Sequence, residues 1–101
     1  MRFNYRNEKG EILTEVYVNP FTKKVTVKNH TDFFLDKAFG NNENVTYDDV
    51  MKFLESRTVP RNREDINEIL AELHMKEYDP YALCKYFGGK VCEDDCYVEF
   101  K

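Results

Sequence analysis

Three arginines are the residues of this chain whose type and spacing most directly suggest ligand chemistry. Arg57, Arg61 and Arg63 surround Pro60, just ahead of an expected helix. Guanidinium groups hold phosphate or carboxylate through forked hydrogen bonds, and a helix N-terminus adds free backbone amides. The spacing therefore predicts an anion-binding cluster. The alternative is internal pairing, because acidic residues lie within one or two turns of these arginines, namely Glu55, Glu64, Asp65 and Glu68.

Carboxylates form a second group, in two short runs. Asp48 and Asp49 are adjacent, and Glu93, Asp94 and Asp95 are consecutive. Carboxylates gathered on one surface imitate the phosphates of a nucleic acid, so these five residues predict binding to a basic groove of a partner protein. Neither run has the DxDxDG spacing of a calcium loop. A solvated turn is the simpler alternative for the second run.

Thiols and histidines are the remaining residues with chemical potential. Cys84, Cys92, Cys96 and His74 are ligand types that zinc accepts, but the paired CxxC spacing typical of zinc sites is missing. No motif marks a thiol as a nucleophile activated by His30 or His74. GxGxxG, P-loop, HExxH and nucleophile-elbow patterns are also missing from the sequence. We therefore expect neither enzymatic activity nor a metal or cofactor.

Composition limits the class of protein. A length of 101 residues with 42% hydrophobic residues fits one domain spanning residues 1–101. The sequence has no apolar run near the ~20 residues of a membrane span and no signal-peptide pattern, and its three cysteines cannot all pair with one another. These features predict a cytoplasmic protein with reduced thiols. The net charge of −4 argues against general nucleic-acid binding.

Alternation of apolar and polar residues predicts an α+β protein that begins with an antiparallel three-stranded meander. Residues 2–7, 11–18 and 24–28 alternate, with breaks at Gly10 and Pro20. In the second strand, Ile12, Thr14, Val16 and Val18 should share the inner face. In the third strand, Val25 and Val27 should point inward. Residues 96–100 alternate as well and should join this sheet. Residues 31–44 fit neither period and predict a loop with at most a short turn.

Three short helices should pack on one face of this sheet. Thr46 is the expected N-cap of the first helix, with Asp48 and Asp49 in its first turn. Its apolar stripe of Val50, Phe53 and Leu54 should lie on the sheet. The third helix should start at Pro80, after Asp79, and run to Phe87, because Gly88 and Gly89 follow.

The second helix has the clearest periodicity. It should begin near Asn62, and Ile66, Ile69, Leu70 and Leu73 then recur at i, i+3, i+4 and i+7. This stripe predicts that the second helix is the central element of the core. Leu70 should be buried between the sheet and a neighbouring helix.

A diffuse pattern over about residues 50–100 resembles a known module. The pattern is Arg57-x-Val59-Pro60-x-x-Arg63, then Leu70, Leu73 and Leu83, then Gly88-Gly89 and Asp94-Asp95-x-Tyr97-Val98. It resembles the small module found ahead of HipA-type kinase domains, or free-standing, in some Firmicutes proteins. Tyr97-Val98 departs from the aromatic pair usual at its end. The sequence contains no kinase motif, so the resemblance implies a stand-alone accessory module without catalysis.

These observations predict a non-catalytic protein-binding module. The leading hypothesis is a phage or mobile-element inhibitor that presents an acidic face to a bacterial defence nuclease, in the manner of anti-CRISPR proteins. The first alternative, suggested by the resemblance, is a regulatory or antitoxin-like partner of a HipA-type kinase. The second is nucleic-acid binding through the basic residues of the meander, Arg2, Arg6, Lys23, Lys24 and Lys28, since residues 1–30 carry a net charge of +3.

Overall fold

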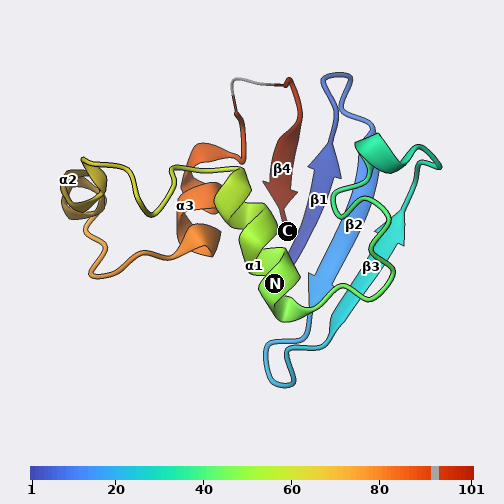
Figure 1. Cartoon of the computed structure of the whole chain (residues 1–101), viewed down its shortest axis with the longest axis horizontal. Helices are drawn as coiled ribbons and strands as arrows, with labels where there is room; N and C mark the ends of the chain where they lie inside the picture. The colour runs from blue at the N-terminus through green and yellow to red at the C-terminus, as the bar shows by residue number, and fades with distance from the viewer. Residues whose placement is uncertain (92–93) are drawn as a thin grey trace.

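The chain forms a four-stranded antiparallel sheet with three α-helices (Figure 1). The computed structural model describes residues 1–91 and 94–101. The strands are β1 (Arg2–Arg6), β2 (Ile12–Val18), β3 (Val25–Asn29) and β4 (Tyr97–Phe100), and their order in the sheet is β3-β2-β1-β4. The predicted α+β class, the N-terminal meander and the C-terminal strand beside it are confirmed.

The inner face of the sheet carries the side chains that the alternation predicts. Phe3, Val16 and Val18 are at most 2% exposed. One prediction for β2 was wrong: Leu13, and not Ile12, belongs to the buried core. The cause is an irregularity in the pairing of β1 with β2, where Tyr5 lies opposite Thr14 but Arg6 lies opposite Ile12. Such a bulge places an extra residue in one strand and redirects its side chains.

Helix boundaries follow the caps that the sequence contains. The helices are α1 (Tyr47–Ser56), α2 (Ile66–Glu72) and α3 (Pro80–Phe87), with a short 3-10 turn at Phe34–Asp36. Thr46 and Asp49 form a reciprocal capping box at the start of α1, Asp79 caps α3, and Gly88 ends α3 in the left-handed conformation. The predicted start of the first helix, both predicted ends of the third, and the predicted loop with a short turn before α1 are confirmed.

The core lies between the sheet and α1. Val50 and Leu54 of α1 are fully buried, and the Phe53 ring stacks on Phe3 at 6.1 Å and meets Tyr5 edge-on at 5.3 Å. The rest of the inner face is covered by the loop ahead of α1, whose Ala38, Phe39 and Val45 pack against the same core. The apolar stripe predicted for the first helix therefore has the predicted role.

The second helix is not the centre of the core, so that prediction was wrong. α2 begins at Ile66, four residues later than Asn62, because residues 57–65 form turns. Leu70 is buried, at 8% exposure, but it is not part of the core cluster of the described residues. Figure 1 shows α2 on the far side of α3 from the sheet. An amphipathic stripe identifies an apolar face but not the element that covers it.

Candidate functional site

Arg57 is an internal anchor and is only 5% exposed. Its guanidinium donates two hydrogen bonds to the Asp94 carboxylate, at 2.9 and 3.1 Å. It also donates to the carbonyl oxygens of Gly89 at 2.8 Å and Cys96 at 2.7 Å. The end of α1 is thereby fixed to the segment between α3 and β4. Arg57 and Asp94 both belong to the pattern that carries the resemblance, and here they pair with each other.

The other two arginines face different ways. Arg61 lies over the Tyr78 ring at 4.5 Å and 3.9 Å from Glu55, and the Arg63 Nε is 2.6 Å from an oxygen of Asp65. Both side chains are more than half exposed. The structure therefore does not gather the three guanidinium groups into one anion site. Internal pairing accounts for Glu55 and Asp65, but not for Glu64 or Glu68, within the described residues.

The predicted acidic face is divided between the two ends of α1. An oxygen of Asp49 accepts hydrogen bonds from the Thr46 backbone amide at 3.0 Å and the Asn42 side chain at 3.1 Å, and these bonds lower the pKa of Asp49. Asp94 is held by Arg57 at the opposite end of α1, and this hydrogen bonding lowers its pKa. Ten residues of helix span about 15 Å.

Of the other three carboxylates, Asp48 and Asp95 are exposed, and Glu93 lies outside the described residues. Asp48 shares the N-terminal end of α1 with Asp49, whereas Asp95 follows Asp94 in the chain. The four described carboxylates therefore do not form one surface.

The basic residues of the meander are also divided. The Arg6 guanidinium binds Glu99 at 3.1 Å and the Gly10 carbonyl oxygen. Lys23 lies over the Tyr47 ring at 4.9 Å, on the helix side of the sheet. Arg2 lies on the uncovered face, over the Tyr17 ring at 5.1 Å, where Glu15 lies in the same hollow as Arg2 and Lys28. The five predicted nucleic-acid contacts therefore do not form one uninterrupted basic surface.

The thiols of Cys84 and Cys96 are free, and Cys92 lies outside the described residues. Burial raises the pKa of the Cys84 thiol to about 11, which makes it a poor nucleophile near neutral pH. Within residues 1–91 and 94–101, no three His, Cys, Asp or Glu side chains are grouped so that they could hold a metal ion. None of the helices in this part of the chain is long and apolar enough to cross a membrane.

The two outer strands of the sheet differ in how their edges are covered. At the β4 edge, the Val98 amide donates to the Gly88 carbonyl oxygen at 2.9 Å. Gly89 has a φ of +65°, and a Cβ there would lie 2.5 Å from a methyl carbon of Val98. Only glycine permits this close approach, so the turn after α3 packs directly on Val98 and covers the β4 edge at that residue.

The β3 edge is open in the described part of the chain. The backbone amide of His30 donates to the Leu13 carbonyl oxygen at 2.8 Å. The backbone amide of Asn19 donates to the Lys24 carbonyl oxygen at 2.9 Å. Between these two bonds β3 pairs with β2 without a register shift. Hydrogen-bonded and non-hydrogen-bonded pairs alternate in an antiparallel ladder. The backbone N–H and C=O groups of three β3 residues therefore point away from the sheet: Val25, Val27 and Asn29.

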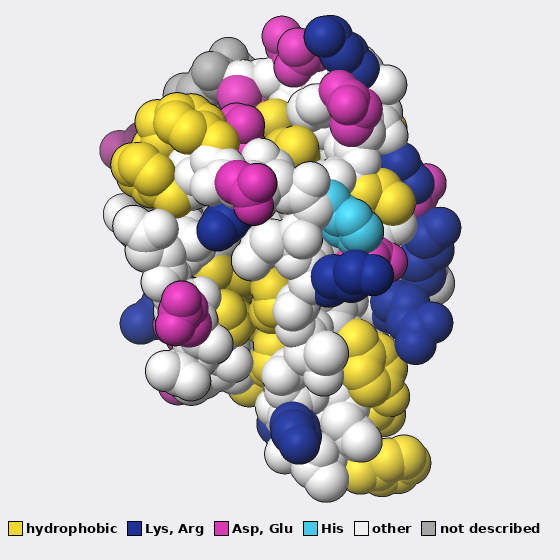
Figure 2. Space-filling view, turned by 90° about the vertical axis from the view of Figure 1, so that its right-hand side faces the viewer, with side chains coloured by type: hydrophobic (Ala, Val, Ile, Leu, Met, Phe, Trp, Pro, Cys, Tyr) yellow, Lys and Arg dark blue, Asp and Glu magenta, His cyan; other side chains and the backbone are white. Residues whose placement is uncertain are grey.

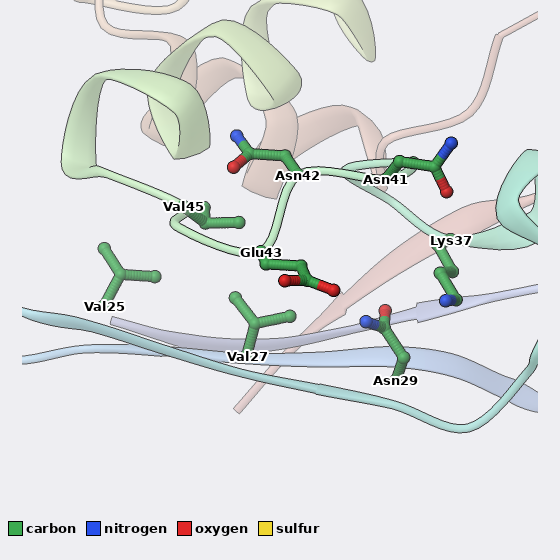
Figure 3. A pocket seen from close by; sticks show the side chains of 9 residues that line it. Val25, Val27, Asn29, Lys37, Asn41, Asn42, Glu43 and Val45 are labelled. Carbon is green, nitrogen blue, oxygen red and sulfur yellow. The ribbon is translucent and has the colours of Figure 1, made fainter.

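The same three residues form the floor of a cavity of about 480 Å³. Its other walls are Lys37, the loop from Gly40 to Glu43, and Val45. Figure 2 faces this side of the molecule and shows hydrophobic side chains at the bottom of a hollow, with Lys and Arg side chains along one border. In Figure 3 the loop runs above β3, and the polar ends of Glu43, Lys37 and Asn29 point into the space between them.

Hydrogen bonds hold the walls of this cavity in place. The fully buried Thr14 donates to the Asn29 side-chain oxygen at 3.0 Å and accepts from the Ala38 amide at 3.1 Å. Asn42 donates to Asp49 at the start of α1. Asp49, predicted as a partner contact, therefore positions the loop above β3.

A second hollow surface lies between α2 and α3. Ile69 and Leu73 of α2, from the stripe predicted to be the core face, line it together with Tyr86 and Phe87 of α3. The two aromatic rings meet edge-on at 4.9 Å and are 68% and 43% exposed. The stripe is thus only partly covered.

The open edge escaped sequence reasoning, although both of its valines were predicted to face inward. They do so, but they are only half-buried. The one sequence signal was the mixture of Lys24 and Lys28 with these valines, since lysine is frequent on edge strands. Comparison with known protein families, curated proteins and solved structures finds no match to this chain.

Proposed function

We propose that this chain is a non-catalytic protein-binding module, and that an extended segment of its partner adds to the sheet as a fifth strand beside β3. One observation carries this proposal. Val25, Val27 and Asn29 direct their backbone hydrogen-bonding groups outward and also form the floor of a 480 Å³ cavity. A segment lying along β3 would complete the ladder and insert alternate side chains into the cavity.

Strand addition suits this geometry for two physical reasons. Backbone groups on an edge gain affinity from the added ladder, whereas pockets for alternate side chains give specificity. Val25 and Val27 are only half-buried, so covering them removes their remaining apolar surface from water at about 25 cal/mol per Å². The tied loop above β3 also lowers the entropic cost of binding, because its position is already fixed.

This proposal keeps the predicted protein-binding role and changes its surface. An acidic face is no longer its basis, because Asp49 and Asp94 are engaged within the chain. The inhibitor and the kinase-regulator hypotheses both remain proposals under this role. Neighbouring genes distinguish them, since a kinase gene favours the regulator and capsid or portal genes favour the inhibitor.

The test removes one edge donor without touching the ladder. Val27→Pro eliminates an outward N–H, which an edge strand tolerates. Thr26→Ala changes an exposed neighbour on the other face and serves as the control. Affinity capture from bacterial lysate, followed by mass spectrometry, should recover a protein with wild type and Thr26→Ala and at least tenfold less with Val27→Pro.

Circular dichroism and thermal unfolding establish that the variants fold. Val27→Asp is the second variant, since it keeps the backbone donor but places a charge in the cavity, and it should lose the partner too. A partner retained by both folded Val27 variants, or no partner captured by wild type, would contradict the proposed role of β3.

A further inference from the structure

We infer that the segment that fits β3 is antiparallel to it, with two acidic residues at its N-terminal end and small aliphatic residues after them. This inference rests on the proposed function and specifies the chemistry of the partner at the same site. It follows from the order of charged and apolar side chains along β3 and the loop above it.

The direction comes from the sheet itself, in which every strand pair is antiparallel. In an antiparallel addition, partner residues opposite Val25, Val27 and Asn29 exchange backbone hydrogen bonds with them and face the cavity. Partner residues opposite Thr26 and Lys28 face the uncovered side of the sheet.

The end of β3 near Asn29 carries a lysine on each face, and the Glu43 carboxylate also points into the cavity there (Figure 3). Lys28 is exposed on the uncovered face, and Lys37 reaches toward Asn29 on the cavity side (Figure 3). Opposite charges directly across a strand pair attract, and like charges repel. An acidic side chain is therefore favoured opposite Lys28, and one opposite Asn29 enters the space that the Lys37 ammonium also enters. These are the first two positions of an antiparallel partner.

The other end of the cavity is apolar. Val25, Val27 and Val45 surround it, and their hydrophobic groups point into one space (Figure 3). Small β-branched side chains opposite the two β3 valines would fill this space and suit an extended conformation. Reading from the partner's N-terminus, the pattern is acidic, acidic, aliphatic, any residue, aliphatic.

A second copy of this chain fits the edge less well. Paired with itself, β3 would bring Lys24 and Lys28 of one copy close to the same lysines of the other. Lysines on an edge oppose such self-pairing. They do not oppose an acidic strand.

The test uses three capped peptides with the wild-type protein: TEEVTVT, TVTVEET and TKKVTVT. The first has the inferred pattern, the second has the same composition and charge in the opposite order, and the third reverses the charge. Titrations followed by amide NMR shifts should show TEEVTVT binding about tenfold more tightly than either of the others. Its binding should also protect the amides of Val25, Val27 and Asn29 from hydrogen exchange.

The double variant Lys28→Gln, Lys37→Gln should reduce this preference to less than about twofold, whereas Lys9→Gln, an exposed lysine in the first turn, should preserve it. Equal affinity for all three peptides, with β3 amides protected, would overturn the inferred pattern but leave strand addition standing. If those amides are protected at high protein concentration without peptide, the occupant of the β3 edge is a second copy of this chain and not an acidic strand. If no peptide protects them and lysate capture is insensitive to Val27→Pro, the proposed function itself is wrong.

Discussion

The two outer strands of the sheet, β4 and β3, differ in whether other parts of the described chain cover their edges. The β4 edge is covered by the turn after α3, which is fixed by the Val98 to Gly88 hydrogen bond and by the buried Arg57. The β3 edge has outward backbone groups, half-exposed valines and a cavity beside it. An uncovered edge exposes a protein to unwanted pairing. At the β4 edge the turn after α3 binds the outward N–H of Val98, the buried residue of that strand. This difference is the basis for proposing that a partner strand adds at the β3 edge.

Loss of Arg57 should weaken the covered edge most. Arg57→Met removes four hydrogen bonds and should lower the free energy of unfolding by about 3 to 5 kcal/mol. We expect the lower value, because the Asp94 side chain is 40% exposed and water can hydrate its carboxylate. Arg61→Met removes an exposed arginine and should cost no more than about 0.5 kcal/mol. Urea unfolding measures both, and equal small losses would mean that the anchor does not stabilise the β4 edge.

The close approach at Gly89 should be nearly as sensitive. Gly89→Ala places a Cβ 2.5 Å from a Val98 methyl carbon at positive φ, and should cost about 2 to 4 kcal/mol from overpacking and backbone strain together. Gly88→Ala has a similar φ of +77° but no atom within 4 Å of the new Cβ, so it isolates the backbone strain of about 1 to 2 kcal/mol. Thermal unfolding of the two variants should separate them. Indistinguishable melting temperatures would argue against tight contact at this edge.

The same valine-to-alanine substitution on each outer strand compares the two edges directly. Val98 is 4% exposed, and Val98→Ala should cost about 2 to 3 kcal/mol through lost burial and a residual cavity. Val27→Ala removes the same atoms from a half-exposed site and should cost about 1 kcal/mol or less. Urea unfolding midpoints of the two variants measure the two losses of stability, provided that the dependence of the unfolding free energy on urea concentration is the same in both. A larger loss at Val27 would show that the β3 edge is part of the stability core.

The smallest expected effect is a dependence on pH at the covered edge. Hydrogen bonding to Arg57 lowers the pKa of Asp94 below its ordinary value of 3.8. A carboxylate with a lowered folded-state pKa stabilises the fold above its unfolded pKa and loses that contribution as pH falls through the folded one. The difference in unfolding free energy between wild type and Asp94→Asn should therefore shrink as pH falls below about 4. A difference that stays constant down to pH 2 would show that the ion pair contributes nothing to the pH dependence.

Local rules predicted most of the fold from the sequence. Thr46, Asp79 and Gly88 each determine a helix end through interactions within a few residues, so their positions were predictable. Leu70 was misplaced because periodicity reports an apolar face without its partner. Ile12 and Leu13 were exchanged because a bulge depends on the neighbouring strand.

The candidate site was harder to predict because it depends on strand order. Val25 and Val27 were predicted to face inward, and apart from Lys24 and Lys28 nothing within 24–28 indicates that β3 has only one neighbour among the described strands. Arg57 was read as a ligand group because its partner Asp94 is 37 residues away in the chain. The sequence showed which charged residues could bind a ligand, but not which of them pair with each other across long stretches of the chain. That pairing makes Arg57 and Asp94 structural.

The pairing of β1 with β4 also has a consequence for the timing of folding. Asn4 and Glu99, which are hydrogen-bonded side by side, are 95 residues apart. During synthesis β1 emerges long before β4, so the β1 edge that pairs with β4 stays unpaired until Tyr97–Phe100 have been made. Contacts of such large sequence separation slow folding, because the chain loses the entropy of closing a long loop before these contacts can stabilise it. We expect the meander and α1 to form an early intermediate whose β1 edge is a transient site for aggregation or chaperone binding.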